Sequence, residues 1–192
     1  AKFCLKNGLT GADFLAGIPG TVGGALAMNA GAFGSEIWSF VTLAEMINRQ
    51  GELINRKTEE FDVHYRRVSQ FSNEWFAAAR FQFDNELEQK SSNIKKLLQQ
   101  RNASQPIGLP SCGSVFKNPK GQYAAKLIEA AGLKGYCHGH AWVSEKHANF
   151  IISNAQTSAK DIEGLVAFIQ QTVKQKFDVT LETEVRILGD EL

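Results

Sequence analysis

The glycine-rich segment GIPGTVGGALAMNAGAFG, residues 17–34, restricts the possible fold more than any other part of the chain. It contains six glycines, one proline and no charged residue. So many residues of poor helix propensity exclude a long regular helix, and the apolar side chains between the glycines exclude a flexible linker. Glycine leaves backbone amides accessible to a ligand, and the apolar residues would form a wall for a large flat ligand such as a flavin ring. A tightly packed glycine turn is equally compatible with this composition.

Composition and charge exclude several classes of function. The chain has 192 residues, 43% of them apolar, which is enough for a core in one large domain or two small lobes. A net charge of +1 without a basic cluster predicts no nucleic acid partner, and no apolar run reaches the roughly 20 residues of a membrane-spanning helix. We therefore expect no membrane association. The three cysteines are odd in number and show no metal-ligand spacing, so we expect no metal site and a reducing, cytoplasmic location.

Hydrophobic periodicity in the first half of the chain predicts strands followed by a helix. The expected elements are a hairpin of residues 41–48 and 52–57, a strand at 74–83, and an amphipathic helix at 86–101 after Asp84 and Asn85. In the strand, alternate residues would share one half-buried face, namely Trp75, Ala77, Ala79, Phe81 and Phe83.

The second half begins after a loop rich in proline, glycine and serine, residues 103–114, which we interpret as a lobe boundary. The expected elements are a helix at 123–132, a strand at 147–153, a long helix that follows Ser158, and a closing strand at 179–188. Ser158 is placed to cap the long helix, with Asp161 in its first turn.

Three short stretches carry polar residues that suit catalysis or binding. Ser114 lies in the polar loop PSCGSVFKNP and would serve either as a proton donor or as an ordinary turn residue. The stretch HYRR (64–67) suits the clamping of a carboxylate or phosphate, and it is equally compatible with a solvated strand edge. Alternating charge in LETEVRILG (181–189) is typical of the wet face of a sheet.

The motifs taken together resemble one family. GIPGTVGGALAMNAGAFG, HYRR, GSVFKNP, AAKLIEAAGLKGY, VSEKHANFIIS and LETEVRILG occur in this order and cover nearly the whole chain. In these motifs the chain resembles the UDP-N-acetylenolpyruvoylglucosamine reductases, known as MurB. The most specific part of the resemblance is GSVFKNP together with LETEVR.

The resemblance implies an α+β fold. It would comprise the second lobe of a two-lobe FAD-binding fold of the vanillyl-alcohol-oxidase (PCMH) type and a C-terminal α+β substrate-binding domain. The implied divisions are residues 1–102 for the lobe, 103–178 for the substrate domain and 179–192 for a strand that returns to the active site. FAD is the implied cofactor and NADPH the co-substrate. The implied reaction reduces UDP-N-acetylglucosamine enolpyruvate to UDP-N-acetylmuramate in peptidoglycan precursor synthesis.

The resemblance also assigns roles to single residues. Ser114 would donate a proton to carbon, while Arg66 and Glu184 would act at the substrate carboxylate. An ionised Glu184 would repel that carboxylate, so a protonated Glu184 that donates a hydrogen bond is the easier arrangement. The residues expected at the flavin are Ile18, Pro19, Gly20, Thr21, Gly23, Gly24, Asn29, Gly31 and Ala32. Those expected to hold the UDP-sugar are Tyr65, Arg101, Lys117 and Asn118.

Several features depart from the family's pattern. Arg66 adjoins a second arginine, Arg67, and we choose Arg66 because it directly follows Tyr65. His138 and His140 stand where the family often has a Gly-Gly-Ala turn, and we expect both at the surface.

The family's first flavin lobe precedes anything seen in this sequence, so we expect the chain to be inactive by itself. The short spacing from Arg66 to Ser114 indicates the shorter family subtype. Another oxidoreductase of the same FAD-binding superfamily, or a non-catalytic nucleotide-sugar-binding protein, would also account for parts of the sequence.

Overall fold

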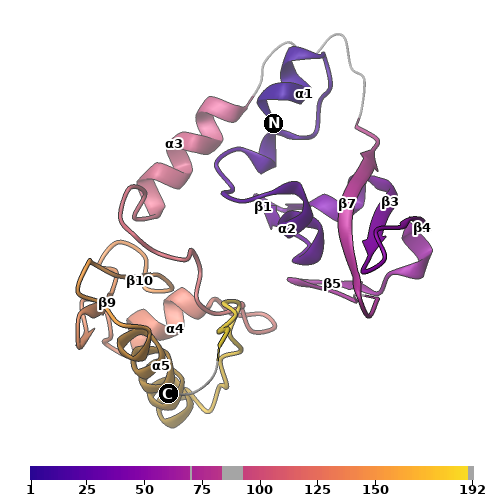
Figure 1. Cartoon of the computed structure of the whole chain (residues 1–192). Helices are drawn as coiled ribbons and strands as arrows, with labels where there is room; N and C mark the ends of the chain where they lie inside the picture. Colours follow the sequence, from indigo (N-terminus) through magenta and orange to yellow (C-terminus); the bar gives the residue numbers. More distant parts are fainter. Residues whose placement is uncertain (70, 84–92, 190–192) are drawn as a thin grey trace. The chain divides into compact units, whose positions relative to one another are not determined.

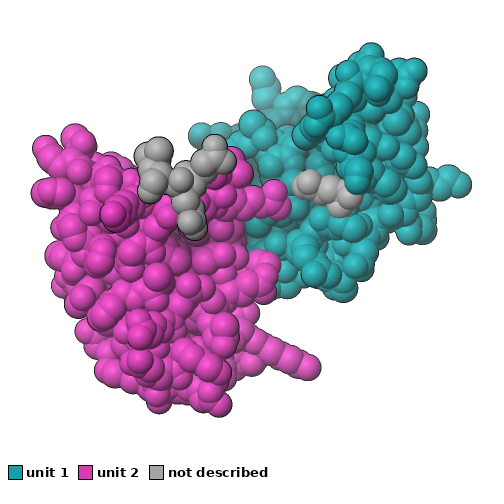
Figure 2. All heavy atoms as spheres, turned by 60° about the horizontal axis from the view of Figure 1, so that its bottom comes forward, with its two compact units in different colours: residues 1–101 teal, residues 102–192 magenta. Residues whose placement is uncertain are grey.

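The computed structural model describes residues 1–69, 71–83 and 93–189. The chain forms two compact units, Ala1–Arg101 and Asn102–Leu192, which Figure 2 colours separately. The division falls inside helix α3 (Ile94–Ser104), one residue before the first boundary expected from the sequence. No helix among the described residues is long and apolar enough to cross a membrane.

The first unit is built around a three-stranded antiparallel sheet with the order β4-β3-β7 (Figure 1). Its elements are α1 (Lys2–Lys6), η1 (Asp13–Leu15), α2 (Val22–Ala27), β1 (Gly31–Ala32), β2 (Ser35–Glu36), η2 (Ile37–Phe40), β3 (Val41–Asn48), β4 (Leu53–Lys57), η3 (Thr58–Glu60), β5 (Val63–His64), β6 (Arg67–Val68), β7 (Glu74–Phe81) and most of α3. The predicted hairpin is confirmed as β3 and β4. The Asn48 side chain holds its turn by accepting the amides of Gln50 and Glu52.

Strand β7 confirms the predicted strand, and it confirms the predicted face at Ala79 and Phe81 but not at Trp75 and Ala77. A register shift in β7 pairs Glu45 with Ala78 and Met46 with Phe76, so Ala77 is an extra residue opposite β3. An extra residue of this kind reverses which side chains face the core on its two sides. Phe76 therefore packs on the core together with Ala79 and Phe81, whereas Trp75, which we expected on that face, is 52% exposed.

The core of the first unit joins the glycine-rich segment to the sheet. Its buried members are Phe14, Leu26, Ile37, Trp38, Val41, Ala44, Met46, Phe61 and Val68. Trp38 lies at its centre, since its ring packs against Phe61 at 4.7 Å between centroids and its Nε1 donates to the Leu26 carbonyl at 2.7 Å. Burial of these side chains is the main stabilising term for the unit.

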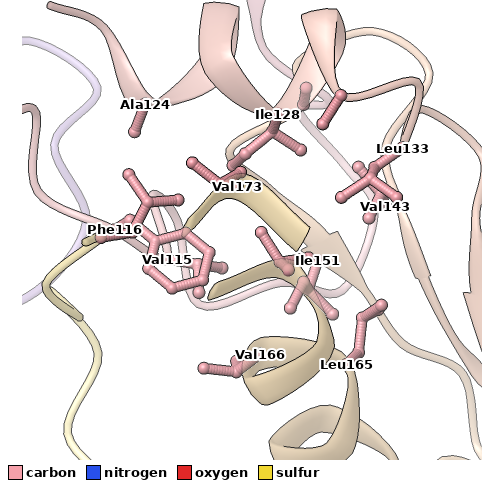
Figure 3. Packing of buried hydrophobic residues seen from close by; sticks show 14 of the residues in the cluster. Val115, Phe116, Ala124, Ile128, Leu133, Val143, Ile151, Leu165, Val166 and Val173 are labelled. Carbon is pink, nitrogen blue, oxygen red and sulfur yellow. The ribbon is translucent and has the colours of Figure 1, made fainter. Parts of the chain in front are cut away.

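The second unit combines two helices with a small antiparallel sheet of order β10-β9-β8. Its elements, besides the end of α3, are α4 (Ala124–Ala130), β8 (Cys137–His138), β9 (Ala141–Val143), β10 (Ile151–Ile152) and α5 (Ala159–Phe177). Side chains from both helices and from the sheet form one buried cluster, which Figure 3 shows with Ile128 of α4, Leu165 of α5 and Val143 of β9 among its members.

Both helices of the second unit were expected from the sequence. Ser158 caps α5, because its hydroxyl accepts the Asp161 amide at 3.1 Å and the Asp161 carboxylate accepts the Ser158 amide at 3.0 Å. The bond from the Ser158 amide to the carboxylate lowers the pKa of Asp161. The buried stripe Leu165, Val166, Ile169 and Val173 matches the predicted helical period.

Two strands predicted for the second unit need correction, and the start of one predicted helix lies outside the described residues. Only Ile151–Ile152 of the expected strand 147–153 pairs as a strand, and residues 147–150 form a turn. The expected C-terminal strand at 179–188 is wrong as a strand, because its only bridge within described residues 179–189 joins Thr183 to Phe116. The expected start of helix 86–101, with Asp84 and Asn85, lies outside the described residues, and α3 accounts for its later part.

Candidate functional site

The glycine-rich segment forms an exposed turn into the short helix α2. Thr21 caps this helix, since its Oγ1 accepts the Gly24 amide at 3.1 Å. Gly20 has φ +112°, a conformation that side chains disfavour, and no atom lies within 4 Å of the position a Cβ would occupy. Pro19, Thr21 and Val22 are exposed beside it, Val22 to 56%. This open backbone with an apolar neighbour fits a flat cofactor that needs amide donors and an apolar wall.

Gly31 serves a different purpose from Gly20. A Cβ at Gly31 would lie 2.5 Å from the Ser35 carbonyl oxygen and 2.8 Å from Cγ of Glu36, so only glycine fits against β2. Ala32 continues the same hairpin and pairs with Ser35. Ile18 is partly buried and donates its amide to the Leu15 carbonyl. These three predicted cofactor residues therefore contribute chiefly to the local fold around the exposed turn.

Asn29, predicted at the cofactor, is 2% exposed and links three parts of the first unit. Its Nδ2 donates to the Glu36 carboxylate at 2.7 Å and to the His64 carbonyl at 3.2 Å, while its Oδ1 accepts the Trp38 amide at 3.4 Å. Both amide hydrogens of the side chain are thus used inside the protein. The backbone of Asn29 has φ +43°, where asparagine is better tolerated than most residues.

Arg66 is held against the same glycine-rich segment. Its guanidinium donates to the carbonyls of Asn29 at 3.1 Å and Gly31 at 2.7 Å, and it lies 3.8 Å from the Glu36 carboxylate. The Arg66 side chain is 16% exposed, whereas that of Arg67 is 66% exposed and approaches only the surface residue Asp62. Of the two adjacent arginines, Arg66, which the sequence analysis chose, is therefore the one built into the Asn29 network.

A cavity of about 520 Å³ opens beside this network. The residues that line it are Asn29, Glu36, Trp38, Ser39, Thr58, Val63, His64 and Tyr65. The Arg66 guanidinium stacks over the Tyr65 ring at 4.8 Å. In the first unit, Asn29 and Tyr65 thus line one cavity, and Arg66 contacts both of them beside it.

In the second unit, the segments that carry Ser114 and Glu184 lie side by side although 70 positions separate the two residues in the sequence. Ser114 forms a bridge with Phe150, and the carbonyl of the next residue, Val115, accepts the Glu184 amide at 2.8 Å. The segment from Ser114 to Lys117 therefore runs between the turn that contains Asn149 and the C-terminal segment. Ser114 is partly exposed, and among the described residues none forms a hydrogen bond with its hydroxyl.

The remaining predicted substrate residues have internal partners of their own. The Lys117 ammonium pairs with the Glu182 carboxylate, and its amide donates to the Glu182 carbonyl at 2.9 Å. Asn118 accepts the Ala124 amide at 3.0 Å and so caps the first turn of α4.

Arg101, also predicted to bind substrate, lies in the first unit, within the predicted lobe 1–102. A Cβ at Gly17 would be 3.4 Å from Cδ and Nε of Arg101, so this side chain packs on the start of the glycine-rich segment. Burial lowers the pKa of its guanidinium.

Sequence reasoning missed three residues around these groups: Glu36, Asn149 and Glu182. Glu36 and Glu182 each face a cation that was predicted, Arg66 and Lys117. No periodic pattern marks them, because each meets its partner only through tertiary contacts. Among the described residues, no group of histidine, cysteine, aspartate and glutamate side chains could hold a metal ion.

Comparison with known proteins first defines the class. Residues 1–56 match the family model of the FAD binding domain, and residues 105–188 match that of the C-terminal domain of UDP-N-acetylenolpyruvoylglucosamine reductase. The chain is therefore an α+β protein that combines a flavin-binding domain with a reductase C-terminal domain, which confirms the predicted fold class.

Individual relatives identify the family. The chain is 53% identical over 190 residues to the UDP-N-acetylenolpyruvoylglucosamine reductase of Coxiella burnetii (strain Dugway 5J108-111), covering 98% of this chain and 60% of that protein. It is 52% identical over 191 residues to the reductase of Alkalilimnicola ehrlichii, and the match covers 99% of this chain and 64% of that protein. The crystal structure of UDP-N-acetylenolpyruvylglucosamine reductase (MurB) from Thermus caldophilus matches with a TM-score of 0.85 and 31% identity, over 98% of this chain and 68% of that one.

The chain belongs to the UDP-N-acetylenolpyruvoylglucosamine reductase (MurB) family, as the sequence motifs predicted. It spans about 60% of the length of the first curated relatives that it matches.

Proposed function

We propose that this chain supplies a flavin-facing lobe and the substrate domain of a cytoplasmic, FAD-dependent reductase. The reaction would reduce the enolpyruvyl ether of UDP-N-acetylglucosamine to UDP-N-acetylmuramate with NADPH. Family membership and the FAD binding domain match at residues 1–56 support this proposal. No nucleic acid or membrane partner is proposed.

The exposed turn of the glycine-rich segment is the part of the first unit that fits the cofactor. Pro19, Gly20, Thr21, Gly23 and Gly24 would lie against FAD, with Gly20 supplying open backbone, and Ile18, Asn29, Gly31 and Ala32 would support the turn from inside. When bound, FAD would supply the transfer of a hydride from NADPH to the vinyl carbon of the substrate.

The protein's own residues would stabilise the negative charge that develops on the substrate and would supply one proton. Reduction of the vinyl carbon builds enolate charge on the substrate carboxylate, and a proton must reach the neighbouring carbon. Arg66 would stabilise that charge, and its orientation is already fixed by two carbonyl acceptors. Glu184, in its protonated form, would donate a hydrogen bond to the same carboxylate, and the Ser114 hydroxyl would deliver the proton.

The observation that carries the proposal is that Ser114 and Glu184 lie on neighbouring segments. The bond from the Glu184 amide to the Val115 carbonyl at 2.8 Å brings a hydroxyl donor and a carboxyl group onto neighbouring extended segments. Lys117 and Asn118 follow on the same segment. Together with Tyr65 and Arg101 they remain the proposed contacts to the nucleotide sugar.

The experiment separates the two half-reactions in Ser114→Ala. Stopped-flow absorbance would follow the flavin in two proteins. One is the chain by itself, and the other is the chain fused to the part of the Coxiella burnetii relative that the match does not cover. We expect normal bleaching of the flavin by NADPH and slow reoxidation by the enolpyruvyl substrate, because Ser114 acts only after the hydride has left the flavin.

Ser111→Ala is the matched control, because Ser111 is an exposed serine three residues earlier in the same loop. It should reoxidise at the rate of the unmodified protein. Equally slow bleaching by NADPH in Ser114→Ala, or an absence of turnover in both forms of the unmodified protein, would contradict the proposal.

A further inference from the structure

Asn149 makes three hydrogen bonds to the two residues that follow Ser114. Its Nδ2 donates to the Phe116 carbonyl at 2.8 Å, its Oδ1 accepts the Phe116 amide at 3.0 Å, and its backbone carbonyl accepts the Val115 amide at 2.9 Å. The residue is 4% exposed. Among the described residues the buried polar side chains are those of Asn29, Ser144 and Asn149, so a buried asparagine in this position is unusual for the chain.

These bonds replace strand pairing that the backbone does not provide. The Ser114–Phe116 segment has only single bridges, from Ser114 to Phe150 and from Phe116 to Thr183. Because residues 147–150 form a turn, their backbone cannot continue as a ladder beside Phe116. The carboxamide of Asn149 offers one donor and one acceptor, as a peptide group does, and so takes the place of the missing strand.

The turn that carries Asn149 is itself held in place by its neighbours. The Ser144 hydroxyl accepts the amides of Lys146 and His147, and the Ser144 amide donates to the Phe150 carbonyl at 2.9 Å. The Asn149 amide donates to Nδ1 of His147 at 3.3 Å. The Asn149 carboxamide is therefore presented to Phe116 in a defined orientation before any ligand is present.

We propose that Asn149 is a positioning residue for Ser114. By fixing the backbone of Val115 and Phe116, it sets the direction of the Ser114 Cα–Cβ bond, since among the described residues no side-chain hydrogen bond orients that hydroxyl. The opposite side of the segment is held by Glu184 and Glu182 through backbone bonds. Asn149 and Glu184 thus hold the segment that follows the proposed proton donor from its two sides. This inference rests on the role of Ser114 in the proposed function.

The first test measures the hydrogen bond between Asn149 and the Phe116 amide without reference to catalysis. Amide hydrogen exchange of the 192-residue chain, followed by NMR, should show the Phe116 amide exchanging at least about tenfold faster in Asn149→Ala, because a buried donor loses its acceptor. The amide of Val173, buried in α5, should keep its rate. Asn154→Ala, which alters an exposed asparagine of the same unit, should change neither rate. An unchanged Phe116 rate in Asn149→Ala would overturn the proposal.

The second test separates positioning from a merely structural role. In the stopped-flow assay described above, Asn149→Ala should slow flavin reoxidation by the enolpyruvyl substrate about tenfold or more, with a normal rate of bleaching by NADPH. The KM for the enolpyruvyl substrate should change less than about threefold, because Asn149 is 4% exposed and its carboxamide bonds to the Phe116 backbone.

Asn149→Asp provides the second variant in case alanine prevents folding. It keeps the acceptor for the Phe116 amide but places an oxygen against the Phe116 carbonyl, so reoxidation should again be slowed while the Phe116 amide stays protected. Normal reoxidation in Asn149→Asp and Asn149→Ala, with slow reoxidation in Ser114→Ala, would overturn only the positioning role. Normal reoxidation in Ser114→Ala would overturn the proposed function and this role together.

Discussion

Replacing Asn29 with alanine should destabilise the first unit more than any exposed substitution. The change removes a charge-assisted bond to Glu36 at 2.7 Å, a bond to the His64 carbonyl and the acceptor of the buried Trp38 amide. A charge-assisted bond contributes about 1.5–3 kcal/mol and an orphaned buried donor costs about 1–3 kcal/mol. Alanine at the positive φ of this position adds about 1 kcal/mol of strain. Allowing for relaxation, we expect a loss of about 3–5 kcal/mol in the free energy of unfolding.

Urea unfolding monitored by Trp38 fluorescence would measure this loss. Substituting Trp75 and Trp142 with phenylalanine leaves Trp38, which lies in the core of the first unit, as the only reporter. Asn29→Gly removes the same side-chain bonds but tolerates the positive φ, so it should be less destabilising than Asn29→Ala by about 1 kcal/mol. Asn55→Ala, at an exposed position of β4, should stay within about 0.5 kcal/mol of the parent.

A loss below about 1 kcal/mol in Asn29→Ala would refute the reasoning, because at least one buried donor is left without an acceptor. The same variant also tests the link to Arg66. The Asn29 carbonyl still accepts from that guanidinium, but Glu36 loses its partner and is free to move toward Arg66.

Three further predictions address the second unit. Ser158→Ala should lower the free energy of unfolding by about 1 kcal/mol, measured by urea titration of α5 helicity, because the Asp161 amide loses the Ser158 hydroxyl as its acceptor while the Ser158 amide can still donate to the Asp161 carboxylate; no change would contradict the cap. Burial lowers the pKa of His147, so the unfolded chain binds a proton more readily than the folded one. The contribution of His147 to stability should therefore be complete above its ordinary pKa of about 6.5 and should decrease as the pH falls below it. His147→Gln should flatten the urea midpoint against pH in that range, and an unchanged profile would exclude His147 as its origin. Glu184→Gln should reoxidise the flavin faster than Glu184→Ala, since glutamine keeps a hydrogen-bond donor, and equal rates would argue that Glu184 makes no such bond.

Elements that rest on local signals were predictable from the sequence. Helix α5 has both a capping pair, Ser158 and Asp161, and an apolar stripe, and these signals depend only on residues near one another in the chain. The β3–β4 hairpin likewise follows from two apolar runs around one short turn.

Errors arose where tertiary contacts decide the conformation. The strand period could not show the extra residue Ala77 in β7, because a bulge is defined by pairing with β3. The 179–188 segment alternates like a strand, yet it meets the Ser114–Lys117 segment at a single bridge and a few backbone bonds. Alternation of apolar and polar residues shows that one face of a segment is half-buried, but it does not show that the segment forms a regular hydrogen-bonded ladder with a neighbouring strand.

The candidate site was predictable in its motifs but not in its internal supports. The resemblance assigned Arg66, Ser114 and Glu184 to catalysis and Asn29 to the cofactor, and these roles stay predictions, whereas Asn149 was not assigned at all. Both asparagines sit in stretches that sequence rules interpret as turns, because asparagine usually hydrogen-bonds to nearby backbone. The partners that matter here are distant: His64 is 35 positions from Asn29, and Phe116 is 33 positions from Asn149.

The two buried asparagines solve the same physical problem in the two units. Arg66 and Ser114 both lie on short irregular segments next to single bridges or two-residue strands, where few ladder bonds restrain the backbone. A carboxamide can donate and accept at once without carrying charge, so it satisfies buried peptide groups at a lower desolvation cost than an ionised side chain. An apolar residue of similar size would leave those groups unpaired, and a carboxylate would repel the carbonyls that need a donor. This requirement explains why asparagine, rather than a bulkier core residue, lies beneath each of the two proposed catalytic segments.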